Sequence, residues 1–174
     1  MHSKLNFNKD YIKLSRHEYY LDTISLLFIL AQILILFFHW NNLDERVPIH
    51  FNFLGSPDGY GSKYVLLILP IISLLLFFGV KSFRFIKLNI YIGKYDEKLS
   101  VILYKLYRSW TSLITSLTMI FFFILLYFSI NIPVNNLNKI PFYIIIFYFL
   151  ILILSLIIYG VIEVFYKKKY HETL

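Results

Sequence analysis

The stretch Val47–Lys63 has the sequence VPIHFNFLGSPDGYGSK and separates two long apolar runs. Its first half alternates with a period of two, which is typical of an extended segment with one face on an apolar surface. The pattern predicts one buried apolar face and one outward polar face. The buried face consists of Ile49, Phe51 and Phe53, and the outward face consists of His50 and Asn52.

A chain reversal is predicted directly after this segment. Ser56-Pro57-Asp58-Gly59 combines the fixed φ of Pro, the backbone-bonding side chain of Asp and the permissive φ of Gly. Ser62 is a suitable N-cap for the apolar helix that follows. The residues predicted to hold the shape of the loop are Pro48, Phe51, Gly55, Gly59, Gly61 and Ser62.

The chain on both sides of this motif is too apolar for a soluble domain. Hydrophobic residues make up 59% of the 174 residues, whereas soluble domains contain about 45–50%. Runs of roughly 17–25 apolar residues are long enough to cross a bilayer as helices. We therefore predict an all-α, four-helix membrane bundle in a single domain, 1–174, with helices at about 22–40, 64–80, 110–130 and 141–163 and the motif loop at 43–63.

The distribution of basic residues predicts the orientation of the bundle. Of the 17 Lys and Arg residues, 14 lie in the N-terminal segment, in 81–109 or in the tail, and three lie in the other two loops. Because cytoplasmic loops are enriched in Lys and Arg, both termini should be cytoplasmic and the motif loop should be extracytoplasmic. Basic residues that flank apolar runs argue against a nucleic-acid-binding domain, so no direct nucleic-acid partner is expected.

Three internal features refine this expectation. Residues 81–109 are basic and amphipathic, which predicts a separate helix lying at the cytoplasmic membrane surface and divided from the second helix by Gly93. Pro70, near the middle of the second apolar run, is expected to kink that helix. Gln32 is expected to form an interhelical hydrogen bond, and the Ser and Thr residues of 111–118 are expected to pack closely against neighbours.

The candidate site consists of His50, Asn52, Asp58 and Lys63, which we expect in one outward-facing patch. One alternative is a purely structural loop, in which His50 and Asn52 bond backbone groups and Asp58 makes the turn. Three functions compete with it. A binding module would hold a peptide, a lipid head group or a partner, and the N-terminus of the second helix with Lys63 would suit an anion. A membrane enzyme would use His50 as a base, Asp58 to orient it and Lys63 to hold an anionic substrate. A small oligomeric transporter would need ionisable groups at membrane depth, which the middles of the four apolar runs lack.

Catalytic and metal-binding arrangements are not recognisable in the motif. One His, one Asp and one Lys in a turn-rich loop match no known catalytic pattern, and His50 with Asp58, Asp44 or Glu45 has no recognised metal-ligand spacing. The absence of cysteine excludes disulfides, thiolate metal sites and cysteine nucleophiles. We therefore expect a protein that is not an enzyme and has neither metal nor cofactor.

The motif resembles the signature of a bacterial multi-pass membrane family of unknown function. The resemblance is carried by LDERVPIHFN at 43–52, then Gly55, Asp58-Gly59-Tyr60 and Ser62-Lys63, which match an IPxHFNxxGxxDGxGSK-like loop that follows the first transmembrane helix in that family. It covers roughly residues 20–130 and is weaker beyond the second helix, where Ile90-Tyr91 stand in place of an expected Pro.

The resemblance implies a location and a class of partner. The family includes a relative, SdpI, that confers immunity to a peptide toxin, so it implies an immunity-type protein of the bacterial cytoplasmic (inner) membrane and cell envelope. A peptide toxin or lipid head group would bind the outer loop. A cytoplasmic repressor would bind the 81–109 segment, as in the immunity relative, and oligomers are possible.

Overall fold

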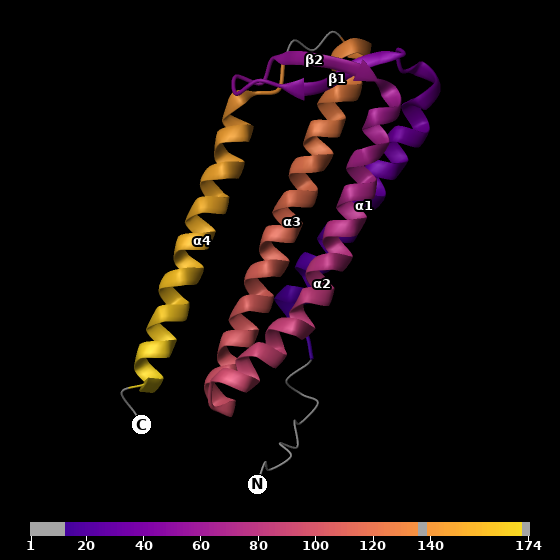
Figure 1. The fold of residues 1–174 in the computed structure, drawn as a ribbon. Coiled ribbons are helices and arrows are strands. Elements are labelled where there is room, and N and C mark those ends of the chain that lie inside the picture. Colours follow the sequence, from indigo (N-terminus) through magenta and orange to yellow (C-terminus); the bar gives the residue numbers. More distant parts are fainter. Residues whose placement is uncertain (1–12, 136–138, 172–174) are drawn as a thin grey trace.

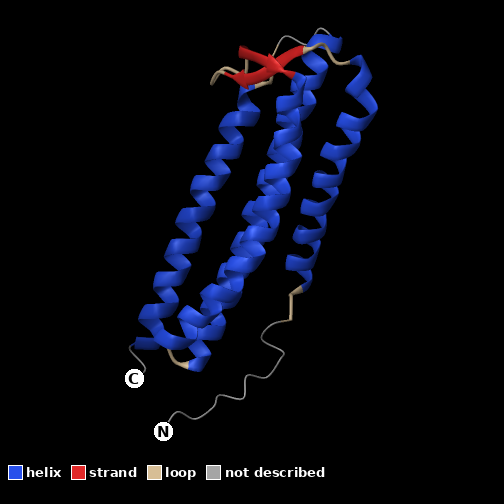
Figure 2. Cartoon of the chain, turned by 45° about the vertical axis from the view of Figure 1, so that its right-hand side comes forward, coloured by secondary structure: helices blue, strands red, loops and turns tan. Residues whose placement is uncertain are grey.

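The computed structural model describes residues 13–135 and 139–171, and within them four long helices run side by side. They are α1 (Arg16–His39), α2 (Ile68–Lys94), α3 (Glu97–Asn135) and α4 (Phe142–His171). A small two-stranded hairpin lies across the end opposite the start of α1 (Figure 1; Figure 2). All four helices are long and apolar enough to cross a membrane, which indicates a multi-pass membrane protein.

The hairpin corrects the all-α prediction. Strand β1 (Arg46–Phe51) pairs antiparallel with β2 (Pro57–Ser62). A short 3-10 turn, η2 (Trp40–Asn42), joins α1 to the hairpin, and a second, η3 (Lys63–Leu67), leads from it into α2. The motif is therefore a folded β-element set between two helices.

The predicted surface helix over 81–109 is wrong. Instead, α2 continues through Gly93 to Lys94, and α3 begins at Glu97. The amphipathic pattern has another cause: the inner ends of α2 and α3 pack on each other through buried apolar residues, while Lys94, Lys98 and Lys105 are exposed. The residues that form this inner core are Tyr91, Leu99, Leu103 and Tyr104.

Two prolines have roles that differ from those predicted. Pro70 lies in the first turn of α2, just after η3. Backbone N–H groups in a first turn have no partner within the helix, so the N–H that Pro lacks costs no helical hydrogen bond. No mid-helix kink is therefore required of it. Pro133, which we expected in a loop from Asn131 to Lys139, lies inside the last turns of α3. Residues 136–138 of that predicted loop, and 1–12 of the predicted basic N-terminal segment, lie outside the described residues.

Helices α1, α2 and α3 form the tightly packed part of the bundle. The polar contact predicted for Gln32 is confirmed: its amide is buried, accepts a hydrogen bond from Ser73 Oγ at 3.0 Å and donates to the carbonyl of Met119 at 3.4 Å. These bonds join all three helices. The close packing predicted for the small polar residues of α3 is also found, because Thr111, Ser112, Thr115 and Ser116 are buried.

Helix α4 contacts the rest mainly through α3 and exposes most of its apolar side chains (Figure 1). One polar contact ties it to α2, where the hydroxyls of Tyr91 and Tyr159 lie 3.3 Å apart. Burial raises the pKa of the Tyr91 phenol, so this group stays a neutral hydrogen-bonding partner.

Candidate functional site

The outer hairpin is fixed to the bundle by the start of β1. Val47 is fully buried in an apolar cluster, which brings together residues of α1, η3, α3 and the segment from Leu43 to the hairpin: Leu36, Leu43, Val47, Leu66, Leu126 and Ile130. Pro48 is buried beside Val47. Burying a Val side chain contributes roughly 1.5 kcal/mol or more, so this cluster holds the base of the hairpin against the helices.

The predicted buried face of the motif is wrong. Ile49 is 40% exposed and Phe53 66% exposed, while Phe51 is only half-buried. For Ile49 and Phe51 the cause is an irregular strand register, with shifts between Pro48 and His50 and between His50 and Phe51, whereas Phe53 lies in the turn beyond β1. A bulge of this kind breaks the two-residue alternation, so consecutive residues, Val47 and Pro48, face the core together.

The chain reverses earlier than predicted, between Asn52 and Ser56. The Asn52 side-chain oxygen accepts hydrogen bonds from the N–H groups of Leu54 and Ser56, at 3.0 and 3.1 Å. Gly55 has a φ of +81°, a conformation that favours glycine. Asn52 therefore shapes this turn, and Pro57–Gly59, the predicted reversal, belongs to β2.

The tip of the turn also touches the segment before α4. The N–H of Ile140 donates to the carbonyl of Gly55 at 2.8 Å. A Cβ atom on Gly55 would lie 1.9 Å from the Ile140 carbonyl oxygen. Gly55 thus allows a backbone contact that connects the hairpin to the entrance of α4.

The proximity predicted for His50 and Asp58 is confirmed. His50 Nδ1 donates to Asp58 Oδ1 at 2.5 Å across the two strands. The pair is open to solvent, with side-chain exposures of 71% and 42%. Because Asp58 engages Nδ1, the ring is oriented, and Nε2 has no hydrogen-bond partner within the described part of the chain. An exposed, oriented imidazole of this kind is suited to bind a polar group from outside.

Lys63 does not join this pair. Its ammonium group lies 3.0 Å from Glu45 and 5.5 Å from the centre of the Trp40 ring. Arg46 lies opposite Ser62, next to Lys63, and His50 lies opposite Gly59. Four residues of β1 therefore separate Lys63 from the His50–Asp58 pair, a distance of about 13 Å along the strand. The single patch predicted from the sequence is therefore wrong: His50 and Asp58 form one site, Asn52 shapes the turn, and Lys63 holds the base of the hairpin. Ser62 does cap η3, as predicted, by accepting the N–H of Tyr64.

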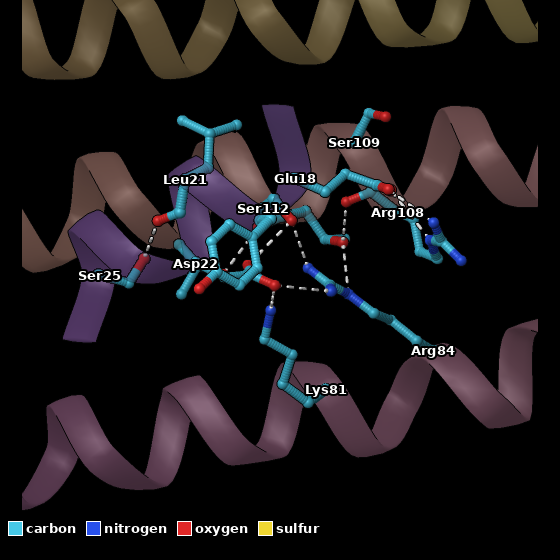
Figure 3. Close-up of polar contacts among 12 residues, drawn as sticks. Glu18, Leu21, Asp22, Ser25, Lys81, Arg84, Arg108, Ser109 and Ser112 are labelled. Atoms are coloured by element: carbon cyan, nitrogen blue, oxygen red, sulfur yellow. Dashed lines mark hydrogen bonds and ion pairs between the residues drawn. The ribbon is translucent and has the colours of Figure 1, made fainter. Parts of the chain in front are cut away.

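A second polar cluster, missed by the sequence analysis, is buried between α1, α2 and α3 at the other end of the bundle (Figure 3). Arg108 donates twice to Glu18, through Nε at 2.9 Å and Nη2 at 2.6 Å. Glu18 also accepts hydrogen bonds from the N–H and hydroxyl of Ser15, both at 2.7 Å. Both charged side chains are almost fully buried. Each charge is therefore stabilised by the opposite charge of its partner and not by water.

Asp22 is the centre of the adjoining part of this cluster. Its carboxylate pairs with Lys81 and, at 3.5 Å, with Arg84, and it accepts a hydrogen bond from Ser112 at 3.0 Å. Arg84 also donates to Thr111 and Ser112, at 3.2 and 2.8 Å. Figure 3 shows these side chains converging from three helices. We call this set, Glu18, Asp22, Lys81, Arg84 and Arg108, the inner charge cluster.

A signal for the inner charge cluster was present in the sequence. Glu18 and Asp22 are four residues apart, Lys81 and Arg84 three, and Arg108 and Ser112 four, so each pair shares one helical face. Glu18, Lys81, Arg84 and Arg108 fall outside the predicted helices, which begin and end close to the apolar runs. Underestimating helix length therefore hid the cluster.

Within the described residues, no group of three or more His, Asp or Glu side chains is placed to hold a metal ion. The two polar sites instead differ in character. The outer pair is open and partly unsatisfied, whereas the inner cluster is closed and its carboxylates are paired. The outer site is suited to recognition and the inner cluster to holding helices together.

Comparison with known proteins gives one match. Residues 27–74 are similar to a family described as a domain of unknown function, DUF1648. This range begins within α1, contains the whole hairpin and ends in the first turns of α2, and it leaves out every member of the inner charge cluster. Neither the curated proteins nor the solved structures include a match.

Proposed function

We propose that this chain is a binding protein of the immunity type, whose hairpin holds an extracytoplasmic peptide such as a toxin. The observation that carries the proposal is the exposed His50–Asp58 pair, on a hairpin that is fixed to the bundle at its base and at its turn. A fixed platform reduces the ordering cost of binding. The motif's resemblance to an immunity-related family supports the same class of partner.

The strands offer a way to bind an extended peptide. Within the described residues β2 pairs only with β1, so its other edge carries backbone groups that are free to pair. An incoming strand can use such an edge. Asp58 and Tyr60 are exposed along β2, and His50 is exposed on β1. The backbone would supply affinity, and the imidazole and phenol would supply selectivity.

The alternative is a membrane enzyme that acts on a lipid or peptide through His50, Asp58 and Lys63. The geometry favours binding, because Lys63 is engaged by Glu45 at the other end of the strands. A group that held an anionic substrate would have to lie close to the base. A lipid head group remains the other candidate ligand of the outer site, and transport by an oligomer is the least favoured function.

The cytoplasmic partner expected from the resemblance would meet the inner ends of α2 and α3. Lys94, Glu97 and Lys98 are exposed there. This surface is the place to look for a repressor or another signalling protein.

A growth-protection assay tests the proposal. Cells that express the chain are challenged with a panel of purified membrane-active peptide toxins, and the inhibitory concentration of each is measured. We expect increased tolerance to at least one peptide. Tolerance should be partly lost in each of three variants, His50→Ala, Asp58→Ala and Tyr60→Ala. The control variant is Lys139→Ala, at an exposed position next to the hairpin, and it should protect as well as the unchanged protein.

Two results would contradict the proposal. One is unchanged tolerance to every peptide in cells with confirmed expression. The other is turnover of a lipid or peptide by the purified protein, abolished by His50→Ala alone, which would establish the enzyme alternative.

A further inference from the structure

The inner end of the bundle contains a polar cavity beside the inner charge cluster. Its volume is about 310 Å³, and it lies between the residues that precede α1 and the first half of α3. The side chains that matter at its wall are Lys13, His17, Lys105 and Ser109. His17 Nε2 lies 2.8 Å from Ser109 Oγ, which joins the two sides.

Counting the described residues, this cavity carries an excess of positive charge. Of the charged groups at its wall, Arg108 and Glu18 neutralise each other through their paired hydrogen bonds. Lys13 and Lys105 form no ion pair with any residue in 13–135 or 139–171. Two ammonium groups with no acidic partner among the described residues, beside a hydroxyl and an imidazole, favour an anion with several oxygen atoms, such as a phosphate group.

An apolar crevice continues from this cavity between α1, α3 and α4. It also has a volume of about 310 Å³, and His17 and Ser109 line both spaces. Leu113, Ile158 and Ile162 are among its apolar walls. A ligand that fits both spaces needs an anionic head and a hydrocarbon tail.

A buried polar atom in the crevice wall points to the same ligand. Trp110 stacks on Tyr159 with ring centres 4.7 Å apart, and both residues line the crevice. The Trp110 indole N–H is buried and has no acceptor among the described residues. Because an unsatisfied buried donor is costly, an acceptor from a ligand would satisfy it. An ester carbonyl between a phosphate and an acyl chain has the right chemistry.

We propose that this is a site for an anionic phospholipid. Lys13 and Lys105 bind its phosphate, Trp110 donates to an ester carbonyl, and one acyl chain occupies the crevice beside α4. The site is on the end expected to be cytoplasmic, where basic pockets between helices bind anionic lipids. It is independent of the outer hairpin and of the function proposed for it.

Fluorescence quenching tests the site. The chain has two tryptophans, so in a Trp40→Phe protein the emission comes from Trp110 alone. The protein is reconstituted in phosphatidylcholine vesicles with a small mole fraction of brominated phosphatidylglycerol or of brominated phosphatidylcholine. We expect brominated phosphatidylglycerol to quench Trp110 more strongly, corresponding to a preference of roughly tenfold over phosphatidylcholine, because two lysines attract the anionic lipid.

Matched variants separate a specific site from general attraction. Lys13→Gln/Lys105→Gln should remove most of the preference, whereas Lys94→Gln/Lys98→Gln, which removes the same charge from the same end outside the cavity, should retain it. Leu113→Phe should lower quenching by filling the crevice, whereas Leu117→Phe, one turn further along α3, lines a different crevice and should not. Retained folding of each variant is checked by its circular dichroism spectrum.

Three outcomes would overturn the proposal. Equal quenching by the two brominated lipids would mean that Trp110 meets only bulk lipid. An equal loss of the preference for anionic lipid in the two double-lysine variants would mean that the lipid is attracted to the whole basic surface and not to this cavity. Relief of quenching by inorganic phosphate, at an ionic strength matched with chloride, would mean that the cavity takes a free anion and does not need the acyl chain.

Discussion

At Gly55 the backbone has a φ of +81°, and the position where a side chain would begin is occupied by the Ile140 carbonyl. Two independent constraints therefore select glycine, one from the conformation and one from the close contact. The sequence motif contained this glycine, but it could not show the contact, because Ile140 is 85 residues further along the chain.

Gly55→Ala should destabilise the protein by about 1–3 kcal/mol from its conformation alone, with a further cost from displacing the contact. The free energy of unfolding is measured in mixed detergent and denaturing micelles. Gly79→Ala is the matched control, because a Cβ there meets no atom within 4 Å and Ala favours the helix by up to about 1 kcal/mol. If both variants were neutral, the Gly55–Ile140 contact would not form in solution.

His50 and Phe53 show what residue patterns can and cannot predict in this motif. A polar pair across a reversal was predicted and is found, because His50 and Asp58 need only oppose each other on adjacent strands. Burial of Ile49 and Phe53 was predicted and is wrong, because register shifts in β1 change which strand residues face the core and Phe53 lies in the turn beyond the strand. The alternation of residue types carries no information about a bulge.

Among the elements, helix existence was predictable and helix length was not. Apolar runs fix the part of a helix inside the bilayer, yet α3 extends from Glu97 to Asn135, well beyond the predicted 110–130. Outside the apolar run, the packing of α3 on α1 and α2 determines where the helix ends. Those packed ends contain the inner charge cluster, in which Glu18 of α1 binds Arg108 of α3.

Glu18→Gln should weaken the contact between α1 and α3 strongly. Breaking a buried pair leaves the other charge uncompensated, which costs about 3–5 kcal/mol. Glu45→Gln also breaks an ion pair, but the Glu45 side chain is 78% exposed, so its cost should stay within about 1 kcal/mol. Unfolding free energies in micelles provide the comparison, and similar values for both variants would mean that water reaches Glu18.

On the scale of the whole molecule, the bundle is polarised from end to end. The hairpin occupies one end (Figure 1), and the inner charge cluster, whose side chains converge from three helices (Figure 3), lies toward the other end, where α1 begins. Helix α4 has apolar residues on nearly every face and packs mainly on α3, so most of its surface suits hydrocarbon. The sequence predicted this membrane character directly, because composition alone determines it.

The orientation predicted from the distribution of basic residues can be tested by labelling. The chain has no cysteine, so single cysteines give unambiguous signals. Leu54→Cys lies at the exposed hairpin turn, and Lys98→Cys lies at the exposed start of α3. With 14 of 17 basic residues in the segments assigned to the cytoplasm, a membrane-impermeant maleimide should label Leu54→Cys in intact cells. It should label Lys98→Cys only after the membrane is permeabilised. The reverse pattern would place the hairpin in the cytoplasm, where an extracytoplasmic peptide could not reach it.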